Sequence, residues 1–442
     1  MSDILLVNTP IARTRPIADP DESVPPIGIG YIYTQLSRSG YQCQFVDANV
    51  GSMLPQDIVR LINEADAEYV GLNVFSSNLT IIRHIVESAE PRKKFLLGGP
   101  AVRFLVPEIK QWNPSGTITV VVGESELILP DILGGRVPLE SVSPNVDVAV
   151  VSPDSRYYPS TINLPLDRAI FVNEPIRRRD LGVVESHIIA SRGCQYDCAF
   201  CTAARSLGPE TRARFRSYDS LAEEIEAIKA RYPDTNCIRV LDDLYLRNAN
   251  SIELAAKLFR QYGLRWRSMA HINTFHELPA RWLGSIRDSG CRELFVGVES
   301  GNDETLKHIR KPFLAATAYS TVCRLIDAGI AVKCYFILGF PGETESAASD
   351  TIRLAHSLRD HAAIVGIPLR ISAFRFRPYH GTSLYEELRS KGVAMTPIVS
   401  RADTTDDPDC NPYDCVSGVY AQYGEEILNS YMAEMERLAA PP

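Results

Sequence analysis

Three cysteines at short spacing constrain this chain more than any other feature of its sequence. Cys194, Cys198 and Cys201 are separated by three and two residues, and Gly193, after an apolar run, predicts that they lie on a loop that follows a strand. Three thiolates on one tight loop can converge on a soft metal centre. They are one short of the usual four ligands of a 4Fe-4S cluster, so one iron would stay open to a ligand from outside the protein.

Two alternatives to a cluster remain for these cysteines. Zinc takes four ligands, and the nearest histidine, His187, lies seven residues before Cys194 inside the expected strand. Cysteines that only pack in a core are the second alternative. The number of nearby ligands favours the cluster.

The loop, with Phe200 directly before its third cysteine, resembles the motif of the radical S-adenosylmethionine (SAM) superfamily. The resemblance implies that Cys194, Cys198 and Cys201 hold a 4Fe-4S cluster whose open iron chelates the amino and carboxylate groups of SAM. One electron from the cluster then cleaves SAM into methionine and a 5'-deoxyadenosyl radical, which abstracts a substrate hydrogen. It also places Phe200 among the residues that bind the cofactors.

Composition and charge further restrict the kind of protein this chain can be. The 442 residues, 45% of them hydrophobic and 23% charged, suit an ordinary globular protein of two or three domains. A net charge of -8 argues against a nucleic-acid binder with a broad basic surface. No signal peptide is expected, because the first residues lack a basic segment, and no apolar run approaches the ~18 residues of a membrane span. The ten cysteines are therefore expected to be reduced thiols or ligands in the cytoplasm.

Residues 1–140 alternate between short apolar runs and segments of helical spacing, which predicts a doubly wound α/β domain with ligands at the carboxyl ends of its strands. The expected strands are 4–7, 43–46, 69–74, 95–97 and 117–122, and the expected helices are 27–39, 55–65 and 79–89.

The glycine-rich turns of this segment resemble those of the cobalamin (B12)-binding domain found in front of many radical SAM cores. They are Pro25-Pro26-Ile27-Gly28-Ile29-Gly30, Val70-Gly71-Leu72-Asn73, Leu97-Gly98-Gly99-Pro100 and Val122-Gly123-Glu124-Ser125-Glu126. Such glycines let the backbone approach a flat ligand, although plain turns would also use them. Many such domains carry Asp-x-His-x-x-Gly, but the first histidine here is His84, in an expected helix. Cobalamin is therefore possible but doubtful.

Prolines mark residues 141–186 as a linker, and Arg177-Arg178-Arg179 within it is expected to be a solvated loop. Strands and helices alternate again over 187–390, as a partial (β/α) barrel requires. Residues 391–442 are expected to form a short C-terminal cap that shields the radical from water. The tail cysteines Cys410 and Cys415 are read as structural.

Polar residues after the barrel strands resemble further motifs of the superfamily. The resemblance gives Glu299 and Ser300, after the fourth strand, a contact with SAM, and it places Gly339-Phe340-Pro341-Gly342, after the fifth, against adenine. Tyr379 belongs to a turn after the sixth strand, with His380 where the family has proline. The resemblance thus places Tyr379, together with Gly339, Pro341 and Gly342, among the expected cofactor-binding residues.

Asp242 and Asp243 end the second strand, where the family often places Gly-Gly-Glu to receive the methionine amino group. Carboxylates suit an ammonium group, so both are expected to be catalytic. Candidates for substrate contacts lie near other strand ends, and they are His271, His276, Tyr245, Arg267, Lys333, Arg375 and Arg377.

Two mechanisms compete for this radical SAM enzyme. In the preferred one the front domain works without cobalamin, and the radical drives dehydration of a diol-bearing aminosugar, a deoxygenation in antibiotic biosynthesis completed by a partner reductase. In the alternative, cobalamin lies between the domains and delivers a methyl group to carbon. The missing histidine and the short chain favour the first. Either needs an electron donor such as flavodoxin or ferredoxin.

Two other classes are less favoured. A tRNA-modifying methylthiotransferase would be expected to carry a second cysteine triad in its front domain and a less acidic chain. A non-catalytic cluster protein would not need the strand ends that resemble a SAM site.

Overall fold

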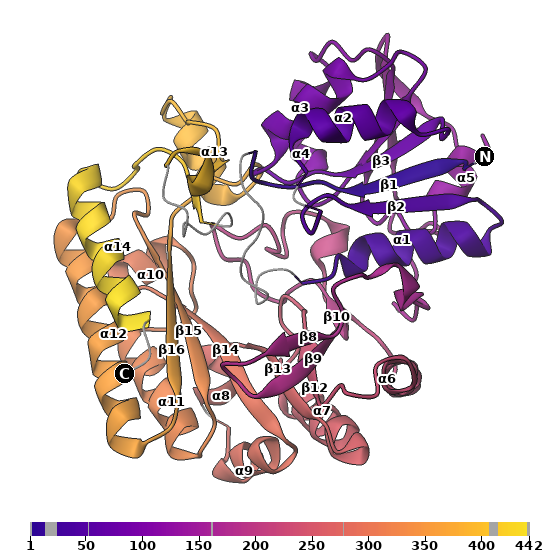
Figure 1. Ribbon diagram of the computed structural model, residues 1–442. Helices are drawn as coiled ribbons and strands as arrows, with labels where there is room; N and C mark the ends of the chain where they lie inside the picture. The colour runs from indigo at the N-terminus through magenta and orange to yellow at the C-terminus, as the bar shows by residue number, and fades with distance from the viewer. Residues whose placement is uncertain are drawn as a thin grey trace.

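The computed structural model describes residues 2–13, 24–51, 53–160, 162–276, 278–405 and 414–439. Two α/β domains follow each other along the chain, and each is built on a seven-stranded sheet. Figure 1 shows the first domain in indigo and purple, with the second in pink to yellow below it. In the described ranges no helix has the length and apolar character needed to cross a membrane.

The first sheet is parallel except for one edge strand. In spatial order its strands are β2 (Cys43–Asp47), β1 (Ile4–Asn8), β3 (Tyr69–Asn73), β4 (Lys94–Gly98), β5 (Thr117–Val122), β7 (Val146–Val150) and the antiparallel β6 (Glu140–Ser143). Helices pack on both faces, with α2 (Pro55–Glu64), α3 (Leu79–Ser88) and α4 (Val102–Ile109) on one and α1 (Ile27–Arg38) and α5 (Leu129–Leu133) on the other. The prediction of a doubly wound domain is confirmed.

The expected boundaries of the linker are wrong at both ends. The first sheet continues past residue 140 through β6 and β7, because Val146 and Val148 are buried in its core. At the other end, β8 (Ile176–Arg178) and β9 (Val183–Ile188) already belong to the second sheet. The prolines that suggested a linker flank these strands instead of replacing them.

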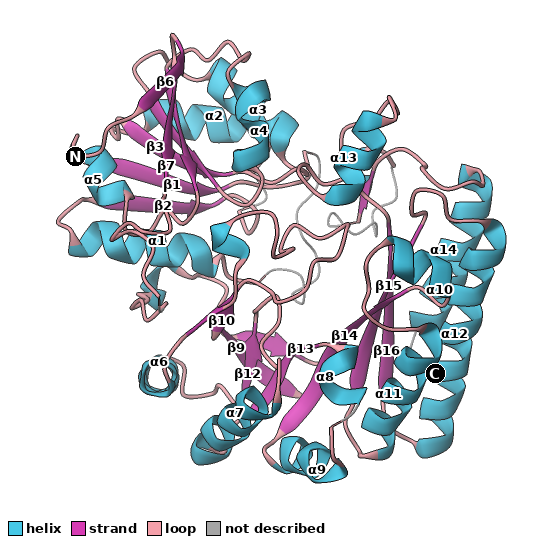
Figure 2. Cartoon of the chain, turned by 180° about the vertical axis from the view of Figure 1, so that it is seen from behind, coloured by secondary structure: helices cyan, strands magenta, loops and turns pink. Residues whose placement is uncertain are grey.

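The second sheet forms the half-barrel, with its helices packed along one side (Figure 2). In spatial order its strands are β16 (Leu369–Arg375), β15 (Val332–Leu338), β14 (Cys291–Glu299), β13 (Arg265–Ala270), β12 (Cys237–Val240), β9 and the antiparallel β8. The helices are α6 (Tyr218–Arg231), α7 (Ala249–Tyr262), α8 (Ile272–His276), α9 (Ala280–Asp288), α10 (Asp303–His308), α11 (Ala315–Asp327) and α12 (Glu345–Val365).

The C-terminal segment packs on the barrel. After α13 (Ser383–Ser390) and a hairpin of β17 (Val399–Ser400) with β18 (Cys415–Val416), the chain ends in α14 (Glu425–Ala439). This helix packs against α12 and β16, because its apolar stripe is buried in the barrel core. Figure 1 shows it in yellow along the outer side of the barrel. Cys410 lies outside the described residues, and Cys415 is buried.

Candidate functional site

The cysteine loop leaves the half-barrel just beyond β9. A two-stranded ribbon of β10 (Ser191–Arg192) and β11 (Arg214–Phe215) closes the loop at its base. Gly193 has a φ of 72°, and a Cβ at this position would lie 2.3 Å from the carbonyl oxygen of Thr211. Only glycine tolerates both conditions, so it is required where the loop leaves β10.

Backbone N–H groups already point at two of the three sulfurs. Tyr196 donates to Sγ of Cys194 at 3.5 Å, and Ala203 donates to Sγ of Cys201 at 3.4 Å. Burial raises the pKa of all three thiols, that of Cys201 to about 12, so bound metal has to displace their protons. Within the described ranges no three His, Cys, Asp or Glu side chains are grouped to hold one metal ion.

The neighbouring carboxylates Asp242 and Asp243 have different surroundings. Asp242 accepts hydrogen bonds from the backbone of Ala190 at 2.8 Å and from the hydroxyl of Ser191 at 2.5 Å, and only 3% of it is exposed. Both oxygens thus hold the strand before the cysteines, and the expected role of Asp242 as a SAM ligand stays a prediction. Asp243 is exposed, and its charge contributes to raising the pKa of Cys194. Of the two carboxylates, Asp243 is the one that faces the loop.

The end of β14 carries a buried ion pair. Glu299 adopts a φ of 67°, which is uncommon outside glycine and marks strain held in place by its surroundings. Its Oε1 lies 2.9 Å from Nζ of Lys311, with side chains 9% and 6% exposed. Burial lowers the pKa of Lys311, but the attraction of Glu299 outweighs it and raises that pKa overall. Lys311 also lies near the Phe200 ring, 5.8 Å from its centroid, which brings the pair to the cysteine loop.

Replacing Lys311 by methionine should lower the free energy of unfolding by about 3–5 kcal/mol, because the carboxylate of Glu299 would remain buried without its partner. Chemical denaturation would measure the loss. Lys307→Met removes an exposed lysine from α10 and should change stability little. The double variant Lys311→Met with Glu299→Gln should recover part of the loss, and a single variant as stable as the unaltered protein would contradict the argument.

Ser300, expected to contact SAM, is used by the fold. Its hydroxyl lies 3.1 Å from that of Thr351 on α12, accepts the N–H of Asn302, and is fully buried. The structure thus gives Ser300 a packing role at the start of the turn before α10, and its expected contact with SAM stays a prediction.

The turn after β15 is tied to the C-terminal segment. Gly339 has a φ of 86°, and its N–H donates to Glu343 at 2.6 Å. The same carboxylate accepts the hydroxyl of Tyr423 at 2.6 Å. Pro341 is buried and Gly342 is exposed with a φ of 79°. The turn expected to face adenine is thus held in shape by residues just before α14.

The turn after β16 meets the first domain. Tyr379 accepts a hydrogen bond from Arg377 at 3.3 Å. Nδ1 of His380 lies 3.0 Å from the hydroxyl of Ser76, which follows β3. A Cβ at Gly381 would lie 2.2 Å from the ring of Phe104 on α4. His380, which stands where the family motif has proline, therefore contributes to the contact between the domains.

His271 stacks on the cysteine loop, a contact that the sequence did not predict. Its ring lies 3.7 Å from that of Tyr196, and Nδ1 accepts the N–H of Asn273 at 3.2 Å. Burial and the nearby charge of Lys311 lower the pKa of His271 to about 2, so the ring is neutral and carries its proton on Nε2. Within the described residues Nε2 is buried without a hydrogen-bond partner.

Several other candidates for substrate contacts are engaged by the fold. Arg267 pairs with Glu185 and Glu293 inside the half-barrel, while Arg375 bonds Asn429 of α14. Lys333 is half-buried there, and burial together with neighbouring arginines lowers its pKa to about 8.

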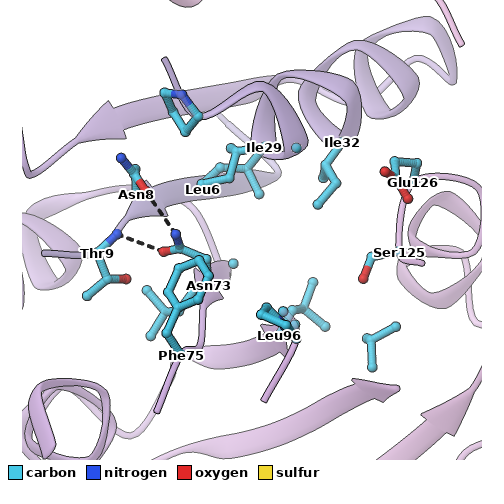
Figure 3. A pocket seen from close by; sticks show the side chains of 18 of the residues that line it. Leu6, Asn8, Thr9, Ile29, Ile32, Asn73, Phe75, Leu96, Ser125 and Glu126 are labelled. Atoms are coloured by element: carbon cyan, nitrogen blue, oxygen red, sulfur yellow. Dashed lines mark hydrogen bonds between the residues drawn. The ribbon is translucent and has the colours of Figure 1, made fainter. Parts of the chain in front are cut away.

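A cavity of about 450 Å³ lies at the carboxyl ends of the first-domain strands, between the sheet and α1. Figure 3 shows Ile29 and Ile32 of α1 on one side of it, with Leu6 beside Ile29, and Leu96 of the sheet on the other side. At the strand ends the cavity is lined by polar side chains and by glycines. The polar and glycine positions include Asn8, Thr9, Asn73, Gly71, Gly98, Gly99, Gly123, Glu124, Ser125 and Glu126.

These residues fit a large ligand with a flat face and amide groups. At Gly99 the φ is 121°, and a Cβ would lie 2.6 Å from the carbonyl oxygen of Val74, so the turn stays bare of side chains. The Thr9 hydroxyl is buried without a hydrogen-bond partner among the described residues. Asn73 bonds Asn8 at 2.9 Å and Thr9 at 2.8 Å, which fixes the strand ends (Figure 3). His84 is exposed on α3 and does not line the cavity.

Two family models match the chain. The model of the Radical SAM superfamily matches residues 188–355, and that of the B12 binding domain matches residues 16–133. The first match contains the cysteine loop together with β12 to β15, and the second contains most of the residues that line the cavity.

Similar proteins include several named as methyltransferases. An uncharacterised methyltransferase of Pyrococcus horikoshii is 27% identical and covers 87% of this chain and 82% of its own. The bacteriochlorophyllide d C-12(1)-methyltransferase of Chlorobaculum tepidum is 23% identical, over 87% and 78%. The cytidylyl-2-hydroxyethylphosphonate methyltransferase of Streptomyces wedmorensis is 21% identical, over 83% and 78%.

Solved structures share the fold over nearly the whole chain. The radical SAM methyltransferase TsrM of Kitasatospora setae, with tryptophan and a SAM analogue bound, superposes with a TM-score of 0.67 at 15% identity, covering 99% of this chain and 89% of its own. The cobalamin-dependent radical SAM enzyme OxsB, with aqua-cobalamin and SAM bound, gives 0.64 at 14% identity, over 98% and 66%.

Proposed function

We propose, from the premise that this chain is a radical SAM enzyme with a B12-binding domain in front of its half-barrel, that it is a cobalamin-dependent methyltransferase acting on a small molecule. One observation carries the proposal. The cavity at the strand ends of the first domain is lined by the Gly123–Glu126 turn, and side chains of that turn pair with the base of the cysteine loop. Relatives named as methyltransferases support the same conclusion.

Bound cobalamin would supply a transferable methyl group, while the cluster and SAM would supply a radical that activates the substrate. The chain's own part is to bind and orient both. The residues that would hold cobalamin include the bare turns at Gly98 and Gly123, the apolar side chains of Ile29 and Leu96, and Thr9 with its unpaired hydroxyl. Among the described residues that line this cavity there is no histidine that could contribute to holding cobalamin.

The sequence favoured radical dehydration without cobalamin, and the comparisons support its alternative. The argument against cobalamin was the missing histidine, but the B12 binding domain model matches without it, and the cavity remains open. Nothing in the site favours a diol-bearing aminosugar or a partner reductase. As a radical SAM enzyme the protein requires a one-electron donor, and a flavodoxin or a ferredoxin is our proposal for that partner.

Asp243 is our candidate for the amino group of SAM, and Asp242 is the matched residue for comparison. Asp243→Asn should keep the cluster and weaken SAM binding about tenfold, roughly 1.4 kcal/mol, since a charge-assisted hydrogen bond is lost. Asp242→Ala should instead cost about 1–3 kcal/mol for each buried donor left unpaired and reduce iron content. Equilibrium dialysis measures SAM affinity, and iron analysis measures the cluster content of each variant. If both variants changed SAM affinity and iron content equally, the assignment of Asp243 to the amino group of SAM would be refuted.

The proposal is tested by metal content. Protein reconstituted anaerobically with iron and sulfide and then incubated with hydroxocobalamin should retain cobalt through gel filtration, together with an iron-sulfur spectrum. Iron without cobalt would refute the methyltransferase and restore the elimination mechanism. Loss of iron in Cys194→Ala, Cys198→Ala and Cys201→Ala would support the assignment of the ligands.

A further inference from the structure

Two carboxylates that line the first-domain cavity also hold the base of the cysteine loop. Oε1 of Glu124 lies 3.0 Å from Nη1 of Arg192, and Oε1 of Glu126 lies 2.6 Å from its Nη2. Arg214 pairs with the same oxygen of Glu124. All four side chains are between 8% and 16% exposed, so these contacts are shielded from solvent and weakly screened by salt.

The two arginines stand at opposite ends of the cysteine loop. Arg192 and Arg214 face each other across the ribbon of β10 and β11, and the three cysteines lie on the loop between them. Arg192 is separated from Cys194 by Gly193 alone. A shift of Glu124 or Glu126 therefore acts directly on the base from which the cysteines project.

The same base is fixed to the first domain by aromatic contact. The guanidinium of Arg192 lies 5.4 Å from the ring centroid of Tyr31 on α1, an arrangement typical of a cation–π contact. Tyr31 in turn accepts a hydrogen bond from Arg216 at 3.4 Å. Two carboxylates and the ring of Tyr31 thus surround the guanidinium of Arg192.

We infer that Arg192 is a positioning residue which couples ligand binding in the first-domain cavity to the cysteine loop, through Glu124 and Glu126. A ligand that fills the cavity contacts the Gly123–Glu126 turn and so favours one arrangement of these carboxylates. Coupling between two sites is reciprocal, so a formed cluster should tighten the binding of that ligand. The inference rests on the proposed function in taking the ligand to be cobalamin.

The test compares hydroxocobalamin affinity with and without the cluster. In the unaltered protein, reconstitution of the cluster should lower the dissociation constant about fivefold or more, the lower range of allosteric coupling. Arg192→Met should show one dissociation constant whether or not the cluster is present. The matched control is Arg103→Met, which removes another contact of the first domain with the same loop, to Glu210 at 2.8 Å, but alters no residue that lines the cavity.

The coupling would be overturned if Arg192→Met kept the full difference in hydroxocobalamin dissociation constant between protein with and without the cluster. It would also be overturned if Arg103→Met lost that difference. Failure of hydroxocobalamin to bind at all would refute the proposed function instead. In that case the rate of iron release to a chelator, measured without cobalamin, still decides the positioning role. Faster release from Arg192→Met than from Arg103→Met supports it, and equal rates overturn it.

Discussion

Replacing Gly193 by alanine should yield a folded protein with little bound iron. The residue's φ of 72° costs an alanine about 1–2 kcal/mol. The larger effect is steric, because the new Cβ would meet the carbonyl oxygens of Thr211 at 2.3 Å and Arg212 at 2.5 Å. Thr211 also accepts the N–H of Cys194 at 3.0 Å. The backbone has to shift where the first cysteine is placed.

Iron analysis and the spectrum of the reconstituted protein check this result. Gly263→Ala is the matched control, because Gly263 ends α7 with a φ of 63° but has open space where a Cβ would stand. It should bind iron normally, with a small loss of stability. A Gly193→Ala protein with the iron content of the control would contradict the steric argument.

Filling the first-domain cavity should remove cobalamin and leave the cluster intact. Gly28 lines the cavity from α1, and no atom lies within 4 Å of a Cβ built there. Gly28→Leu would therefore project into empty space, and leucine favours the helix over glycine by about 1 kcal/mol. We expect at least a tenfold weaker retention of hydroxocobalamin, roughly 1.4 kcal/mol, with unchanged iron.

Gly284→Leu supplies the comparison for this variant. Gly284 lies inside α9 of the second domain, also with open space around a Cβ, so the same substitution tests the helix without the cavity. It should retain cobalamin normally. Equal retention by both variants would place cobalamin outside this cavity.

The sequence predicted the order of elements well, because most of them are long runs of one period. Strands such as β15 are buried on alternate residues, and the expected strand 117–122 matches the observed bounds of β5. Two of the elements that were not predicted contain prolines, which locally disfavour a helix or a strand. Pro107 lies inside α4, and the hairpin of β6 and β7 carries Pro144 in its turn. Tertiary burial outweighs the local cost of both prolines.

The site could be predicted only where its functional residues lie close together in the sequence. Three cysteines on one loop are such a pattern. Adjacent Asp242 and Asp243 looked equivalent, but neighbouring side chains point in different directions, so only the structure separates a buried anchor from an exposed carboxylate.

The pairing of Lys311 with Glu299 and of Arg192 with Glu126 could not be foreseen. The second joins residues 66 positions apart, and no sequence period links such residues. The stacking of His271 on the loop is a contact of the same long-range kind.

The most direct test of the account follows the products of SAM. Protein loaded with cluster and cobalamin, given SAM and a one-electron reductant, should release S-adenosylhomocysteine in an amount that follows its cobalt content, because that product requires loss of the methyl group. Protein loaded with the cluster alone should form none. Release of only 5'-deoxyadenosine and methionine, whatever the cobalt content, would contradict a methyltransferase.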